Sequence, residues 1–330
     1  MRKASPMLAR YRATGANLPW SDLRRGHGVA LDGYFWRFSD PASGRVIVAL
    51  CGVCRDGTGG SWANLALAAH PGGFLVDADV AAAGADPNRY AVWAQGDLAA
   101  LRADEASLHL EIGPTAGIAV ELAPRRDLAR PFLGGVGVAQ VLPGLGQYWH
   151  PHLLGAEVRG SAWLGGERVR LDGWQVYAEH NWGGAGFPRR WWWGQAQGFD
   201  REDVCVAFAG GEVTLGPARL EATGLVLALG DQIVRWGNPL LSRVHAAVTP
   251  GSWRLRARWA EWDIELEGRA DPADAHRLPV PLPEQRHSVH TAHEHLAGEL
   301  SLTVTRRHRT IFAGRSRLAG LEIGEAPGPQ

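Results

Sequence analysis

Apolar and polar residues alternate strictly along several stretches of this chain. Residues 253–259 read Trp-Arg-Leu-Arg-Ala-Arg-Trp, and residues 262–267 read Trp-Asp-Ile-Glu-Leu-Glu. Residues 109–112 and 118–122 alternate in the same way on either side of the Gly113-Pro114 turn. Alternation with a period of two places every second side chain on one face, as in an antiparallel strand with one buried face. The pattern therefore predicts strands whose Arg and Glu side chains face water.

Further apolar runs, bounded by Gly and Pro, predict more strands. Their approximate ranges are 29–38, 46–53, 62–69, 73–77, 153–163, 169–178, 191–199, 204–209, 220–229, 300–305, 310–313 and 318–323. Helical periodicity is found only over Leu98–Glu105, and the Pro- and His-rich stretch from Asp271 to His295 predicts a long loop. Many short strands joined by tight turns favour an all-β fold of up-and-down barrels, which leave no exposed sheet edge.

The length allows two such barrels. The chain has 330 residues, of which 45% are hydrophobic, and an eight-stranded barrel is wide enough to hold one small ligand. We expect a boundary near Phe187-Pro188, with an N-terminal barrel over residues 1–187 and a C-terminal barrel over residues 188–330. The 15 Trp residues suit either a barrel interior or a site that grips a bulky apolar ligand.

Charge and targeting signals narrow the class of partner. The formal net charge is zero, which excludes the basic footprint of a nucleic-acid-binding protein and the pull of a polybasic segment toward anionic lipid. No run approaches the roughly 20 apolar residues of a membrane span, and residues 1–20 lack the apolar stretch of a signal peptide. We expect a cytoplasmic protein that meets the membrane surface only transiently, to take up a hydrophobic ligand.

A distinctive block lies in the centre of the chain. Residues 174–183 read Trp-Gln-Val-Tyr-Ala-Glu-His-Asn-Trp-Gly, followed by Gly186-Phe187-Pro188 and by Trp-Trp-Trp-Gly-Gln over residues 191–195. This block resembles the signature of the tocopherol cyclases and their bacterial relatives. Weaker matches, over residues 32–38 and 315–322, resemble an early strand and the C-terminal strand of the same family.

The resemblance implies a fold and an activity. The family has two lipocalin-like antiparallel β-barrels in one chain, a fold it shares with carotenoid 1,2-hydratases, and its named activity closes a chromanol ring from a prenylated hydroquinone. The sequence departs from the family at His180, where the plant enzymes usually have Lys, and at Asp32, where Glu is usual. The His-rich stretch over residues 286–295 has no counterpart in the pattern.

Cyclisation or hydration of an isoprenoid alkene needs a strong proton donor and a surface that tolerates a tertiary cation. A buried carboxyl group has a raised pKa and can donate the proton, while aromatic faces stabilise the cation. On a strand, Tyr177, Glu179 and Asn181 share one face, and Trp191, Trp193 and Gln195 share another. We predict that these six residues line a cavity, with Trp182 nearby, in which Glu179 is the acid and Asn181 orients it. The alternative is a structural network at the junction of the two halves.

Two other groups are candidates for the same site. Tyr148, Trp149, His150 and His152 flank a proline, and His150 is a candidate for proton transfer. A ligand-free barrel mouth is the alternative for this group, because two His residues alone seldom complete a metal site.

Asp32 is a second candidate acid, and by strand parity it faces with Tyr34 and Trp36. No metal site is predicted, since the His residues of the stretch 287–295 have no cysteine partners and are expected in a solvated loop.

The sequence therefore predicts a cofactor-independent enzyme of the isomerase or cyclase type. It carries no nucleotide, phosphate-loop or redox motif. The alternatives are a hydratase that acts on a carotenoid or another isoprenoid, and a lipocalin-like carrier that binds such a ligand without converting it.

Overall fold

The computed structural model describes residues 30–86, 91–124, 135, 146–184, 186–215, 218–238 and 242–326, so residues 1–20 lie outside the described residues.

Strands of the first half form two antiparallel sheets. Sheet A has the order β10-β13-β1-β2-β3-β4, and sheet B has the order β12-β11-β9-β8-β7-β6-β5. The strands of sheet A are β1 (Leu31–Asp40), β2 (Arg45–Arg55), β3 (Ser61–His70), β4 (Phe74–Val80), β10 (Gln147–Leu154) and β13 (Gln175–Gly183). The strands of sheet B are β5 (Ala82–Ala85), β6 (Ala91–Gln95), β7 (Ala99–Asp104), β8 (Ser107–Ile112), β9 (Ala116–Pro124), β11 (Ala156–Leu164) and β12 (Glu167–Arg170).

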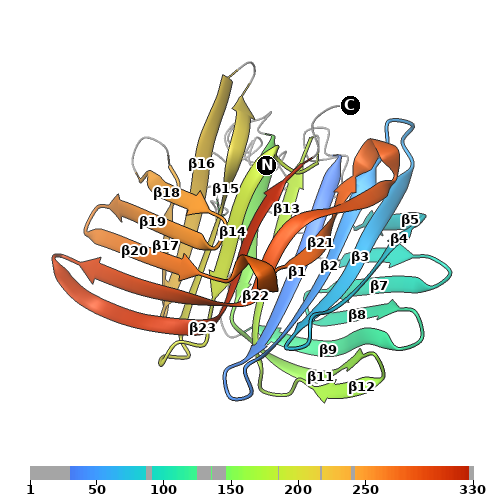
Figure 1. Cartoon of the computed structure of the whole chain (residues 1–330), viewed down its shortest axis with the longest axis horizontal. Coiled ribbons are helices and arrows are strands. Elements are labelled where there is room, and N and C mark those ends of the chain that lie inside the picture. Colours follow the sequence, from blue (N-terminus) through green and yellow to red (C-terminus); the bar gives the residue numbers. More distant parts are fainter. Residues whose placement is uncertain are drawn as a thin grey trace, which may run out of the picture.

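The second half of the chain forms sheet C, with the order β17-β16-β15-β14-β23-β22-β20-β19-β18, and β21 pairs with β22 beside this path. Its strands are β14 (Arg190–Ala196), β15 (Val204–Leu215), β16 (Ala218–Leu229), β17 (Gln232–Trp236), β18 (Val244–Thr249), β19 (Ser252–Trp259), β20 (Trp262–Arg269), β21 (His276–Leu282), β22 (His287–Arg306) and β23 (Arg309–Glu325). Short 3-10 turns cover Pro272–Asp274 and Pro283–Gln285. Figure 1 shows sheet C on one side of the molecule and sheets A and B on the other.

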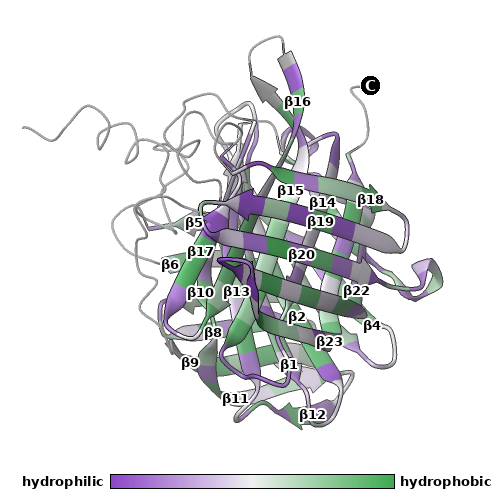
Figure 2. Ribbon diagram, turned by 90° about the vertical axis from the view of Figure 1, so that its left-hand side faces the viewer, coloured by the Kyte–Doolittle hydropathy of each residue, from purple (hydrophilic) through white to green (hydrophobic). Residues whose placement is uncertain are grey.

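The all-β prediction is confirmed. The strictly alternating segments are the outer strands β19 and β20, and Figure 2 shows hydrophilic and hydrophobic residues alternating along both ribbons. Two local predictions are wrong. Residues 98–105 contain strand β7 instead of a helix, because Leu101 and Ala103 point into the first core while their neighbours face solvent. The expected loop over residues 271–295 contains β21 and the start of β22, which pair with each other.

Each half surrounds its own core. Sheets A and B pack face to face, and β3 with β5 and β11 with β13 are the strand pairs with the most extensive contact between them. Sheet C curls until β16 contacts β18 and β17 contacts β19. Within the part of the chain that the structure describes, the hydrogen-bonded order of each sheet remains open at its ends. Strand β13 ends in sheet A and β14 begins in sheet C, and the boundary at 187/188 stays a prediction.

The two halves pack against each other along an interface that we call the seam. It consists of two further apolar clusters: one packs β2 and β3 against β21–β23, and the other packs β10 and β13 against β14–β16. Strands β1, β13 and β14 are consequently buried on both faces almost without interruption. A strand buried on both faces has no polar side in its sequence, so its two faces differ only in what each one contacts.

Candidate functional site

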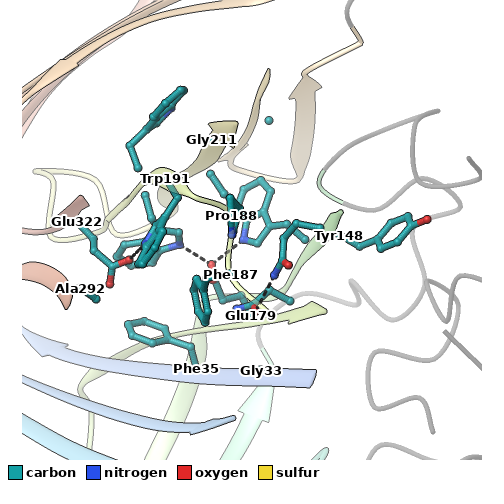
Figure 3. Close-up of a pocket in the computed structure, with 18 of the residues that line it drawn as sticks. Gly33, Phe35, Tyr148, Glu179, Phe187, Pro188, Trp191, Gly211, Ala292 and Glu322 are labelled. Carbon is teal, nitrogen blue, oxygen red and sulfur yellow. Dashed lines mark hydrogen bonds between the residues drawn. The ribbon is translucent and has the colours of Figure 1, made fainter. Parts of the chain in front are cut away.

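A cavity of about 470 Å³ lies at this seam. Its volume is within the range of about 300–1,000 Å³ that is usual for small-molecule sites. Strands β1, β10 and β13 of sheet A line one side, and strands of sheet C line the other (Figure 3). Most of the lining is aromatic or aliphatic, including Phe35, Leu50, Phe187, Trp191 and Trp193. The cavity therefore suits an apolar ligand with few polar groups.

Glu179 is the central polar group of the cavity. Three donors converge on one of its carboxylate oxygens, Oε2: the Tyr177 hydroxyl at 2.5 Å, Trp193 Nε1 at 2.7 Å and Trp149 Nε1 at 2.8 Å. An indole N–H can only donate, so both tryptophans require Oε2 to be an acceptor. Among the described residues no hydrogen bond to Oε1 is found. Because Oε2 already accepts three hydrogen bonds, Oε1 is the favoured position for a proton when the carboxyl group is protonated.

Two opposed effects set the acidity of Glu179. Burial raises its pKa, since the side chain is only 5% exposed, while the hydrogen bonds from Tyr177, Trp149 and Trp193 lower it. Burial is the larger effect. Donors that bind the charged form also stabilise the carboxylate that remains after a proton is lost. Burial therefore favours the protonated form of Glu179, and the three donors stabilise the carboxylate that would remain after a proton transfer.

The prediction that three residues of β13 share one face, directed to the seam, is confirmed. Tyr177, Glu179 and Asn181 point to the same side, and Glu179 and Asn181 line the cavity. Tyr177 was predicted to line it as well, but it is buried behind the lining, where it binds Glu179. Asn181 does not orient Glu179, however. Its Oδ1 accepts a hydrogen bond from Gln147 Nε2 at 3.2 Å, and it sits against Gly33, where an added Cβ would lie 2.7 Å from that oxygen. The residues that orient Glu179 are the three donors.

Strand β14 contributes the indoles that the sequence predicts. Trp191 and Trp193 line the cavity, and the Trp193 ring meets Phe35 edge to face with centroids 5.1 Å apart. Gln195 is fully buried beyond the cavity, where its side-chain oxygen accepts a hydrogen bond from Arg37 at 3.3 Å. The prediction that Gln195 lines the cavity is therefore corrected: it packs at the seam instead.

Asp32 lies on the opposite face of sheet A. Its carboxylate is paired with His180 Nε2 and accepts a hydrogen bond from the Tyr34 hydroxyl at 2.6 Å. The His180 ring stacks between Tyr34 and Trp182, with centroid distances of 4.9 and 4.4 Å. This face points into the core between sheets A and B. Asp32 does not line the seam cavity, which corrects the prediction that it is an acid there.

Several aromatic residues that were predicted to bind substrate belong to the same core. Trp36 and Trp182 are buried there, and Tyr148 stacks on Trp182 at 5.5 Å, with its side chain directed away from the cavity in Figure 3. Tyr34 and Tyr148 border the cavity, but their rings pack on the core side. Of the residues predicted to bind substrate on β1 and β10, only Trp149 reaches the cavity through its indole.

His150 is not placed for proton transfer in the cavity either. It is paired in register with His180 and is therefore on the core side of β10. Burial lowers its pKa to about 3, with smaller contributions from His180 and Arg235. A bulge interrupts the register between Pro151 and Leu153, and His152 lies within it, outside the cavity lining. Both histidines are thus apart from Glu179, and His150 is a neutral core residue.

Phe35 and Glu322 are among the cavity residues that sequence reasoning missed. Phe35 has the opposite parity to Tyr34 and Trp36, which the sequence analysis places on one face with the candidate acid Asp32. Glu322 ends the C-terminal block that resembles the family, and that resemblance was the available signal. Its carboxylate accepts a hydrogen bond from Trp191 Nε1.

The described residues contain no group of three or more His, Cys, Asp or Glu side chains arranged to hold a metal ion. No described helix is long and apolar enough to cross a membrane.

Comparisons with known proteins agree with the motif analysis. A family model described as tocopherol cyclase-like matches residues 83–325. A rice protein (Oryza sativa subsp. japonica) named "Probable tocopherol cyclase, chloroplastic" is 26% identical over 191 residues, which span 54% of this chain and 40% of the rice protein. The crystal structure of kievitone hydratase from Nectria haematococca superposes with a TM-score of 0.53 at 11% identity, covering 89% of each chain, which indicates a shared fold.

Proposed function

The chain belongs to the tocopherol cyclase-like family, and from this premise we propose that it is a cofactor-independent enzyme that protonates an isoprenoid alkene and closes a chromanol-type ring. One observation carries the proposal: a buried carboxyl group, with three donors on one oxygen, faces an aromatic cavity of ligand size. The substrate class is a prenylated hydroquinone or a related isoprenoid phenol. Its prenyl chain matches the apolar lining, and transient contact with a membrane surface to collect it stays a prediction.

The chemical sequence begins at Glu179. The proton on Oε1 passes to the alkene, a C–H bond forms and the positive charge develops on the tertiary carbon. The carboxylate left behind is stabilised at Oε2 by Tyr177 and the two indoles. Aromatic faces near a cation contribute about 0.5–2 kcal/mol each, and the rings of Phe35, Trp191 and Trp193 border the space where it forms. Attack by the phenol oxygen on the cation then forms the C–O bond that closes the ring, and the phenol O–H bond breaks as its proton is released.

Hydration is the second candidate, since the same acid would serve and water would replace the phenol as nucleophile. The cavity has polar groups that suit a bound water: the Asn181 amide, the Gln147 amide and the Thr223 hydroxyl all border it. A water held by such groups is fixed in the position from which it attacks. The cyclase proposal is preferred because the central motif is that of the family.

A product analysis separates these candidates. The purified protein is incubated with a prenylated hydroquinone, and the product is examined by mass spectrometry. Conversion without a change of mass supports cyclisation, and a gain of one water supports hydration. Binding of the hydroquinone, seen as quenching of Trp fluorescence, without any conversion in the wild-type protein would overturn both in favour of a carrier.

A further inference from the structure

Glu322 is a second carboxyl group in the same cavity, contributed by the other half of the chain. It lies on β23 in register with Trp193 of β14, and Trp191 Nε1 donates a hydrogen bond to its Oε1. Trp193 donates to Glu179 in the same way. The two tryptophans are two residues apart on one strand, about 7 Å. Adjacent indoles of β14 thus anchor two carboxyl groups, one from each side of the seam.

Glycines on both sides of Glu322 make room for these indoles. Gly320 and Gly324 are two residues before and after it, on the same face of β23. A Cβ at Gly324 would overlap the Trp191 indole, and a Cβ at Gly320 would lie 2.9 Å from the Trp193 ring. The alternation Gly-Leu-Glu-Ile-Gly over residues 320–324 therefore lets each indole lie across the strand next to the carboxyl group. Glu322 lies in a recess formed by these glycines and indoles, and the recess opens into the cavity.

The charges around Glu322 come from three neighbouring strands. Glu179 faces it from β13, and Glu294, its register partner on β22, is fully buried. Both carboxylate oxygens of Glu294 lack a hydrogen-bond partner among the described residues, and its pKa is raised well above the usual range by burial and by Glu322. Arg37 of β1 partly offsets that effect on Glu294. Burial raises the pKa of Glu322 to about 7, the hydrogen bond from Trp191 opposes this rise, and a negative charge on Glu179 adds to it. Glu322 therefore ionises more readily while Glu179 holds the proton.

We propose that Glu322 is the second catalytic group of the cavity, the base that takes the proton from the attacking hydroxyl group while Glu179 is the acid. This inference rests on the proposed function. Their surroundings differ: three donors stabilise the Glu179 carboxylate once its proton has left, whereas a single indole binds Glu322 and leaves its carboxylate the better proton acceptor. Two carboxyl groups with different environments are a common basis for dividing acid and base tasks.

The step balances without a further reactant. The O–H bond of Glu179 breaks as the alkene C–H bond forms. The hydroxyl oxygen of the substrate, or of water, forms the C–O bond to the cation, and its O–H bond breaks as the proton moves to the Glu322 carboxylate. One proton has then moved from Glu179 to Glu322. Its return to Glu179 resets the enzyme and leaves a net isomerisation, or a net addition of water.

The test compares Glu322→Gln with Glu325→Gln, an exposed glutamate on the same strand. General acid–base groups contribute roughly 10²–10⁴-fold, so we expect Glu322→Gln to lower kcat at least about 100-fold and Glu325→Gln to leave it unchanged. In Glu322→Ala, added formate should restore part of the turnover, because a small carboxylate can occupy the vacated recess. Formate should not alter Glu325→Ala. Wild-type turnover by Glu322→Gln, with Glu179→Gln inactive, would overturn the assignment and leave the proposed function intact.

A spectroscopic arm keeps the test independent of turnover. Binding of the prenylated hydroquinone is followed by infrared difference spectroscopy in the carboxyl region. A group that touches the ligand gives a shifted carboxyl band in the wild-type protein and in Glu325→Gln, and this band is missing in Glu322→Gln. If the wild-type protein converts no substrate but this band shifts, the proposed function fails while Glu322 remains a ligand contact. A difference spectrum that is the same in Glu322→Gln as in the wild type excludes Glu322 from the site.

Discussion

Glu179 and Asp32 are both buried carboxyl groups on neighbouring strands, but they face opposite sides of sheet A. Glu179 points into the seam, where its partners are two indole N–H groups and a phenol hydroxyl beside an open cavity. Asp32 points into the core between sheets A and B, where His180 and Tyr34 satisfy it. The comparison teaches that burial alone does not identify a catalytic acid. What separates the two is whether one oxygen of the carboxyl group remains available to a ligand.

Glu179→Gln should produce the largest effect, because it removes the carboxylic acid that faces the cavity. General acid catalysis is worth roughly 10²–10⁴-fold, so we expect kcat for the prenylated hydroquinone to fall by about that factor. The amide is similar in size to the carboxyl group, and circular dichroism should show a folded protein. Retained turnover in the folded variant would mean that the two carboxyl groups do not differ in function.

Asp32→Asn should act on stability instead. Removing one partner of a buried, paired charge costs about 3–5 kcal/mol, and we expect the free energy of unfolding in urea to fall by about 3 kcal/mol. Turnover per folded molecule should stay within about twofold of the wild type. A folded but inactive Asp32→Asn protein would show that Asp32 takes part in catalysis, which contradicts its assignment as a structural residue.

The stability of the core between sheets A and B should also depend on pH, through His150. Burial lowers its pKa to about 3, below the unfolded value of about 6.5. The stability that it contributes is complete above about pH 6.5 and is lost as the pH falls toward 3. The slope is about 1.4 kcal/mol per pH unit, or about 2 kcal/mol between pH 6.5 and 5. His150→Phe should reduce the slope of the unfolding free energy against pH over that interval; an unchanged slope would contradict the burial of a neutral imidazole.

Trp193→Phe should give the smallest effect. It removes one of the three donors to Glu179 and keeps an aromatic ring beside Phe35. A hydrogen bond to a charged group is worth about 1.5–3 kcal/mol, and two donors remain, so we expect kcat to fall about 10-fold. Trp182→Phe on the core face is the matched control, with loss of stability and no change in kcat. Equal effects of the two variants on kcat would show that the hydrogen bond from Trp193 to Glu179 makes no particular contribution to catalysis.

Strand periodicity predicted much of the fold and part of the site. The outer strands were evident because they alternate, and the sharing of a face by Tyr177, Glu179 and Asn181 follows from the same rule. Parity could not say which face of β1 meets the cavity, because β1 is buried on both faces. Phe35 was missed and Trp36 was chosen for this reason. Glu322 is about 140 residues from Glu179 in the chain, and only the contact between sheets A and C brings them into one cavity.

The central claim is that Glu179 transfers a proton to a carbon of the substrate, and isotope labelling tests it most directly. The protein is equilibrated in D₂O and given the prenylated hydroquinone, and the product is examined by mass spectrometry and NMR. The account predicts one deuterium bound to carbon, next to the new C–O bond, in the wild-type product and no such product from Glu179→Gln. A cyclised product without carbon-bound deuterium, or equal deuterium incorporation by the folded Glu179→Gln protein, would contradict it.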